Sequence, residues 1–132
     1  MIYPNREHII RLNYQIITTS KGLFIPPNNL INPDSLEWVL NTIQYPLFDS
    51  YPTIEEKSAL LCWTIIRSHI FNDGNKRTGM VALETFLNMN GEIINASDVE
   101  IKDIALFVAD HNNKKTSKSE LIRWIHEHKL SS

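Results

Sequence analysis

The chain has 132 residues, of which 42% are hydrophobic, and a formal net charge of −2. This length falls in the range of one domain with one core, so we expect residues 1–132 to form a single domain. The slightly acidic balance argues against general nucleic-acid binding, and the absence of any apolar stretch of about 20 residues predicts no membrane-spanning helix.

Helix signals dominate the first half of the chain. Asn5 can cap a helix that continues to about residue 18. After a loop rich in Gly and Pro, the order Asn, Pro, Asp at residues 32–34 predicts a second helix that ends near residue 43. Residues 44–53 contain two prolines and three aromatic residues, so we expect an extended or irregular segment there.

The second half is also predicted to be helical. Thr53, with Glu56 three residues later, predicts a capped helix that is apolar nearly all round and therefore central. It contains Cys62, which as the single cysteine cannot form a disulfide within the chain and favours a cytoplasmic protein. Further helices are expected over residues 76–90, from Ser97 or Asp98 to about 112, and from Ser117 or Ser119 onwards. The fold is therefore predicted to be a compact all-α bundle.

The most informative stretch is residues 69–77, His-Ile-Phe-Asn-Asp-Gly-Asn-Lys-Arg. It lies between two predicted helices, so its polar middle must turn tightly and open the second helix. Gly74 lets the backbone approach an anion, which the first N–H groups of a helix and its dipole attract. Asn75 can cap this helix. Lys76 and Arg77 place two cations in its first turn, where the dipole disfavours them unless an anion binds.

His69 and Asp73 add reactive groups beside this predicted anion site. Asp73 supplies an oxygen ligand suited to Mg²⁺, which commonly binds one or two carboxylates together with substrate phosphates. His69 supplies an imidazole, the side chain that most often serves as a general base. Each residue alone has an ordinary structural explanation, but an ordinary turn gives no reason for two adjacent cations flanked by His and Asp. The joint pattern favours phosphoryl or nucleotidyl transfer.

These residues resemble the signature of the Fic/Doc family, a His-x-Phe loop followed by an acidic residue, a small residue, Asn and an Arg two positions later. Lys76 occupies a position where nucleotidyl-transferring Fic enzymes resemble one another in having Gly, so the resemblance is closest to the Doc-like branch, called death-on-curing. Gly74 departs from the Ala of Doc. The resemblance implies a Fic-like helical bundle in which a central helix-loop-helix carries the active-site loop.

The resemblance also implies a role for each residue of the loop. His69 would deprotonate the target hydroxyl, Phe71 would anchor the loop in the core and Asp73 would hold Mg²⁺. Lys76 would reshape the anion site so that the γ-phosphate of ATP faces the nucleophile, which implies protein phosphorylation on Ser or Thr. The residues that would bind the nucleotide phosphates are Gly74, Asn75, Lys76 and Arg77.

The implied protein is a toxin of a toxin-antitoxin pair that acts on a protein target, with elongation factor Tu as a candidate. The self-inhibitory Glu motif of some relatives is absent, so inhibition is expected from an antitoxin protein. Two alternatives stay open: a Fic-type adenylyltransferase that carries out AMPylation, and a catalytically silent module that binds nucleotide or antitoxin.

Two further segments have competing interpretations. In Fic-like proteins the region matching residues 44–53 holds the target segment, which would make a target flap of Tyr45, Phe48 and Tyr51; a plain loop covering the core is the alternative. A basic cluster of Lys114, Lys115 and Lys118 is interpreted as a solvated connection between helices, so direct nucleic-acid binding is not expected.

Overall fold

A computed structural model describes residues 1–22, 24–45, 50–110, 112 and 117–131. The described residues confirm the predicted all-α fold, with one small addition that the sequence did not predict: two three-residue strands pair antiparallel, with Ile93 opposite Leu130. The elements are α1 (Arg6–Ser20), α2 (Pro33–Gln44), α3 (Ile54–Arg67), α4 (Asn75–Met89), β1 (Glu92–Ile94), α5 (Asp98–Ala109), α6 (Ser117–His128) and β2 (Lys129–Ser131).

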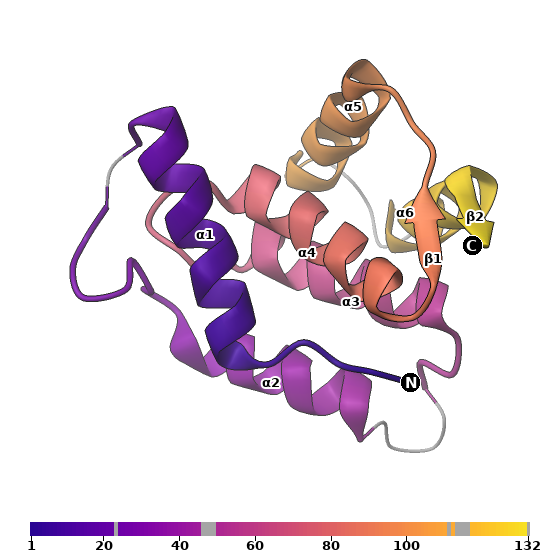
Figure 1. Cartoon of the computed structure of the whole chain (residues 1–132), viewed down its shortest axis with the longest axis horizontal. Helices are drawn as coiled ribbons and strands as arrows, with labels where there is room; N and C mark the ends of the chain where they lie inside the picture. The colour runs from indigo at the N-terminus through magenta and orange to yellow at the C-terminus, as the bar shows by residue number, and fades with distance from the viewer. Residues whose placement is uncertain (23, 46–49, 111, 113–116, 132) are drawn as a thin grey trace.

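Helices α3 and α4 lie side by side in the middle of the molecule, with α1 and α2 on one side and α5 and α6 on the other (Figure 1). Their close approach depends on Gly79 in α4. A Cβ atom at this position would lie 2.7 Å from Cγ1 of Ile66 and 3.1 Å from the carbonyl oxygen of Cys62. Because real Cβ atoms do not approach so closely, the packing of α4 on α3 requires glycine here.

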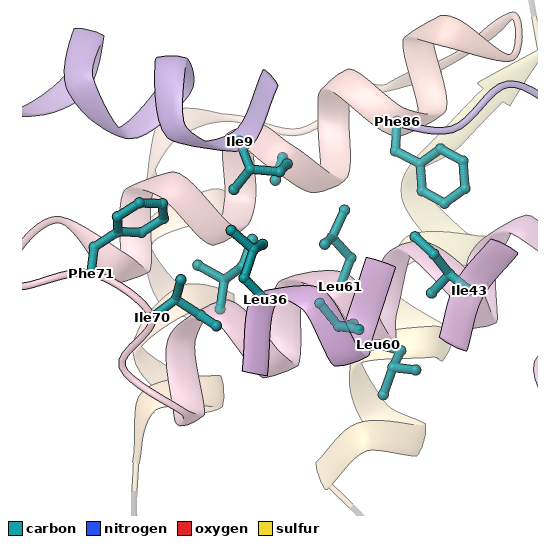
Figure 2. Packing of buried hydrophobic residues seen from close by; sticks show 11 residues of the cluster. Ile9, Leu36, Ile43, Leu60, Leu61, Ile70, Phe71 and Phe86 are labelled. Carbon is teal, nitrogen blue, oxygen red and sulfur yellow. The ribbon is translucent and has the colours of Figure 1, made fainter. Parts of the chain in front are cut away.

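The core consists of two clusters on opposite sides of the α3–α4 pair. Figure 2 shows part of the first cluster, where Phe86 and Leu61 of the central pair meet Ile9 of α1 and Ile43 of α2. The second cluster joins the other side of the pair to α5 and α6. The prediction that the helix after Thr53 would be central is confirmed, because most of α3 is buried. Its buried residues are Lys57, Ser58, Ala59, Leu60, Leu61, Cys62, Thr64, Ile65 and Ile66.

Four helices start where the sequence predicted, each with a side chain that accepts a hydrogen bond from the N–H group three residues later. The capping residues are Asn5, Asn32, Thr53 and Ser97. Other predicted boundaries differ by one to three residues: α1 ends at Ser20 rather than near residue 18, α4 begins at Asn75 after a glycine cap, and α5 ends at Ala109 rather than near residue 112. Among the described helices, none combines the length and apolar character needed to cross a membrane.

Candidate active site

His69 is carried on backbone that leaves α3 in an uncommon conformation. Its φ is 47°, in the left-handed region that side chains rarely adopt, so neighbouring contacts must hold it there. Asn32 Nδ2 donates to the carbonyl of Ser68 at 3.0 Å. The N–H groups of Ile31 and Asn32 donate to the carbonyl of Ile70 at 2.9 and 3.0 Å. The exposed His69 side chain therefore projects from backbone that is fixed on both sides.

The rest of the loop is fixed by the segment that precedes α2. Phe71 is fully buried, where a residue that anchors the loop would lie. It forms an antiparallel bridge with Leu30, and the N–H of Asn72 donates to the carbonyl of Asn29 at 2.9 Å. Residues 29–32 thus pair with residues 68–72, although they are some 40 positions away in the sequence.

Asn75 does not cap α4, so that prediction was wrong. The N-cap is Gly74, which has a φ of 78° and no side chain to accept a hydrogen bond. The Asn75 side chain instead closes the loop behind it: Oδ1 accepts from the N–H of Phe71 at 2.9 Å, and Nδ2 donates to the carbonyl of Phe71 at 2.8 Å. The Asn75 amide therefore fixes the shape of the loop. The backbone N–H groups of the first turn of α4 remain without a side-chain cap.

His69, Asp73, Gly74 and Lys76 line one depression of about 200 Å³ at the start of α4. Ala109, the last residue of α5, also lines it. The positive end of the α4 dipole and the Lys76 ammonium both favour an anion here. Of the residues expected to bind phosphate, Arg77 is exposed and lies outside the lining of this depression. The loop therefore brings the predicted proton acceptor, carboxylate and anion-binding groups to one place.

Asp73 fits a Mg²⁺ ion only if a substrate supplies further ligands. One oxygen, Oδ1, accepts from the N–H of Gly74 at 2.8 Å, which orients the carboxylate. Among the described residues, no three His, Cys, Asp or Glu side chains gather into a cluster that could hold a metal by themselves. One carboxylate beside a phosphate-binding turn is the arrangement in which Mg²⁺ is shared between protein and nucleotide.

The residues considered for a target flap lie apart from this depression. Tyr45 is 70% exposed and, with Tyr51, lines a separate depression that also includes Trp38 and Asn41. The Nζ of Lys118 lies 6.0 Å from the centre of the Tyr51 ring. Phe48, and likewise Lys114 and Lys115, fall outside the described residues. The segment that pairs with the loop is residues 29–32, and the role of Tyr45 and Tyr51 in holding a target stays a prediction.

Sequence reasoning missed the asparagines that hold the loop from outside it. Asn13 and Asn29 are both fully buried, and Asn32 contributes both its backbone and its side chain. A signal for Asn13 was available: it lies between Ile9 and Ile17 at helical spacing, so it interrupts an apolar stripe with a polar side chain. Such an interruption predicts a buried hydrogen-bonding role, although not its partners.

Comparisons with known proteins agree with the geometry. The model of the Fic/DOC family matches residues 3–87, which include α1 to α3, the whole loop and all but the last two residues of α4. A segment of 43 residues is 46% identical to the protein named Toxin Doc of Mycolicibacterium smegmatis. That segment covers 33% of this chain and 33% of the relative, so the aligned region spans about a third of the relative's length. The chain belongs to the Fic/DOC family.

Proposed function

We propose that this chain is a Doc-like toxin, an ATP-dependent enzyme that transfers a phosphate to a Ser or Thr hydroxyl of a protein. The observation that carries the proposal is the shared depression lined by His69, Asp73 and Lys76 at the start of α4. A proton acceptor, a metal-binding carboxylate and a phosphate-binding helix start are the groups that phosphoryl transfer requires. The relative named Toxin Doc supports the assignment to a toxin.

The proposed reaction begins with the target hydroxyl. His69 accepts its proton while the oxygen attacks the γ-phosphorus of ATP, the bond to the bridging oxygen breaks, and ADP leaves with that electron pair. The first N–H groups of α4 and Lys76 bind the phosphate oxygens in the depression, and Arg77, exposed in the same turn, is our candidate for a further phosphate contact outside its lining. Asp73 would hold Mg²⁺, which when bound neutralises the charge that develops on the transferred group.

Two partners follow from this function. The first is the protein substrate, for which a translation elongation factor such as elongation factor Tu is our candidate. The second is an antitoxin, expected to bind the chain and suppress its activity. Such an inhibitor can be a segment that is disordered alone and folds on the toxin surface. Release of this segment would restore activity.

Labelled ATP distinguishes the reactions. The purified chain is incubated with bacterial lysate or purified elongation factor Tu, and with ATP labelled at either the α or the γ phosphate. We expect protein to gain label from the γ position alone, and no label with His69→Ala or with excess chelator. Label from the α position alone would make the chain an adenylyltransferase, and nucleotide binding without label from either position would favour a silent binding module.

A growth experiment tests the toxin assignment separately from the chemistry. Induction of the wild-type chain in bacteria should arrest growth, while induction of His69→Ala to the same level should not. A small protein encoded beside the chain should restore growth when it is expressed together with the wild type. Equal growth of both strains, with folded wild-type protein in the cells, would refute the toxin assignment.

A further inference from the structure

Asn13, in the middle of α1, is a fully buried amide with bonds to three different parts of the fold. Its Nδ2 donates to the carbonyl of Asp73 at 2.9 Å and to Oγ1 of Thr78 at 3.1 Å. Its Oδ1 accepts from Nδ2 of Asn29 at 3.0 Å. A carbonyl can only accept, so the bond to Asp73 fixes which end of the amide faces the loop.

Asn29 extends this contact to the other side of the loop. It is also fully buried, and its φ of 61° is a left-handed value that asparagine tolerates better than most side chains. Its Oδ1 accepts from the N–H of Ile25 at 3.0 Å, and its carbonyl accepts from the N–H of Asn72. The two asparagines therefore hold consecutive residues of the loop: the backbone carbonyl of Asn29 binds Asn72, and the side-chain amide of Asn13 binds Asp73.

The end of α1 also borders the Asp73 carboxylate directly. A Cβ atom at Gly22 would lie 2.9 Å from Oδ2 of Asp73 and 3.1 Å from Cδ1 of Ile17, so a larger residue here would push the ends of these two side chains aside. Asn13 fixes the carbonyl of Asp73, Gly74 donates to Oδ1, and Gly22 borders Oδ2. Hydrogen bonds from neighbours thus place the carbonyl and one carboxylate oxygen of Asp73.

Stability alone gives little reason for an amide in this position. Burying a polar side chain costs free energy that its hydrogen bonds must offset, whereas an apolar side chain would continue the stripe formed by Ile9 and Ile17. What the amide provides, and an apolar residue cannot, is a directed bond to the carbonyl of Asp73. Its placement points to control of the loop geometry.

We propose that Asn13 is a positioning residue that fixes the Asp73 peptide, and through it the direction in which the carboxylate meets a metal–nucleotide ligand. The metal part of this inference rests on the proposed function. Supporting residues of this kind, when removed, typically weaken metal affinity about 10–100-fold. Thr78 provides a matched control, because Thr78→Val removes a bond of the same Asn13 amide and leaves the bond to Asp73 in place.

The test compares Asn13→Ala, Thr78→Val and wild type in three measurements: thermal unfolding, affinity for Mn²⁺ in the presence of ATP, and hydrogen exchange of the Gly74 amide by NMR. Both variants should unfold at lower temperature. Asn13→Ala alone should weaken Mn²⁺–ATP binding about 10-fold or more and speed exchange of the Gly74 amide. If Asn13→Ala does not fold, Asn13→Leu, which keeps about the side-chain size and adds no charge, takes its place.

Each outcome decides the proposal. Equal changes in binding and exchange for both variants, or wild-type values for the Asn13 variant, would overturn it and leave Asn13 a purely structural residue. If wild type itself does not bind Mn²⁺–ATP, the proposed function fails. Gly74 exchange in the ligand-free protein then still decides whether Asn13 positions the loop.

Discussion

The two ends of α3 are fastened by different chemistry. At its C-terminal end, loop 69–75 is held by backbone pairing and by uncharged asparagine amides. At its N-terminal end, Glu55 binds Lys129 at 2.8 Å, and Lys129 also binds Glu92 at 2.8 Å, which ties β2 to α3 and β1. A second pair, Glu100 with His128 at 3.0 Å, joins α5 to the end of α6.

The difference follows from what each end has to do. Charges near loop 69–75 would compete with a phosphate or a metal ion for Lys76 and Asp73, whereas amides hold geometry without changing the local potential. The far end has no such requirement. An α-helix rises about 1.5 Å per residue, so the 14 residues of α3 separate the two ends by roughly 20 Å, beyond the screening length at physiological salt. Charges at the far end are therefore largely screened from the site.

The pKa values of the charged residues at the N-terminal end of α3 reflect these ion pairs. Hydrogen bonds to Glu55 and Glu92 raise the pKa of Lys129. Burial alone would raise the pKa of Glu55, but hydrogen bonds from Lys129 and His126 contribute to a net lowering. His126 and His128 contact different partners, Glu55 and Glu100.

The largest expected effect of any substitution is on the chemistry at loop 69–75. His69→Ala removes the proposed general base, and such bases contribute roughly 10²–10⁴-fold, so phosphate transfer should fall by that factor. Because the side chain is exposed, the melting temperature should change little. The measurement is the rate of label transfer from γ-labelled ATP beside a melting curve. Near-normal transfer by the folded variant would remove His69 from the mechanism.

Asp73→Asn tests the metal assignment with little change of shape. A metal ion supplies several kcal/mol of charge stabilisation in the transition state, and about 1.4 kcal/mol corresponds to tenfold in rate, so we expect transfer to fall roughly 10²-fold. Raising the Mg²⁺ concentration should recover part of the loss if the variant binds the ion more weakly. Wild-type transfer that persists in excess chelator would contradict the assignment of Asp73 to a metal.

Asn75→Ala tests whether uncharged amide hydrogen bonds hold loop 69–75 in place. It leaves the N–H and the carbonyl of Phe71 without their side-chain partner, which should lower the free energy of unfolding by about 1–3 kcal/mol. Asn88→Ala, at an exposed position of the same helix, should change it by less than about 0.5 kcal/mol. Because no charge is involved, the loss should be the same at low and high salt when measured by denaturant titration. A loss that disappears at high salt would contradict this account.

Lys129→Met tests the ion pairs at the N-terminal end of α3. It leaves the carboxylates of Glu55 and Glu92, only 15% and 20% exposed, without their shared cation. We expect a loss of about 1–2 kcal/mol in the free energy of unfolding. Salt in 1 M NaCl screens only the exposed part of these partly buried charges, so the difference from wild type should shrink in part, whereas that of Asn75→Ala should not change. If salt changes the loss of unfolding free energy equally in Lys129→Met and Asn75→Ala, the two ends of α3 are not held by different kinds of interaction.

The smallest expected effect is a pH dependence carried by Glu100 and His128. A hydrogen bond to the carbonyl of Trp124, followed by the interaction with Glu100, raises the pKa of His128. A raised pKa means that the stabilisation is full below the unfolded value, about 6.5, and is lost as pH rises through the folded value. Bonds to Ser97 and then to His128 lower the pKa of Glu100, so its contribution is lost only as pH falls below about 4.3.

Thermal unfolding of wild type and Glu100→Gln at pH 5.5 and pH 8.5 measures this effect. The glutamine keeps the side-chain shape and removes the charge. The stability difference between the two proteins should be larger at pH 5.5, where His128 is protonated, than at pH 8.5. If the stability difference between wild type and Glu100→Gln is the same at both pH values, the charges of Glu100 and His128 do not contribute to stability.

The sequence by itself determined most of the helix boundaries and the set of side chains that the loop carries. The caps of α1, α2, α3 and α5 are local, since each side chain binds an N–H group three residues away, so residue type and spacing were enough to predict those four starts. The reactive residues of loop 69–75 are also adjacent in sequence. Their convergence on one depression needed only a tight turn between two helices.

The tertiary structure decided which groups hold that loop in place. Asn75 could have capped α4, but the left-handed turn at Gly74 directs its amide back to Phe71. Asn13 and Asn29 reach the loop from positions 60 and 43 residues before the residues they bind. Sequence spacing carries no information about such pairings, because they form only once α1 packs on α4 and the segment before α2 lies along the loop. Local hydrogen bonding could therefore be predicted from the order of residues, whereas the contacts that orient the proposed site depend on the packing of distant segments.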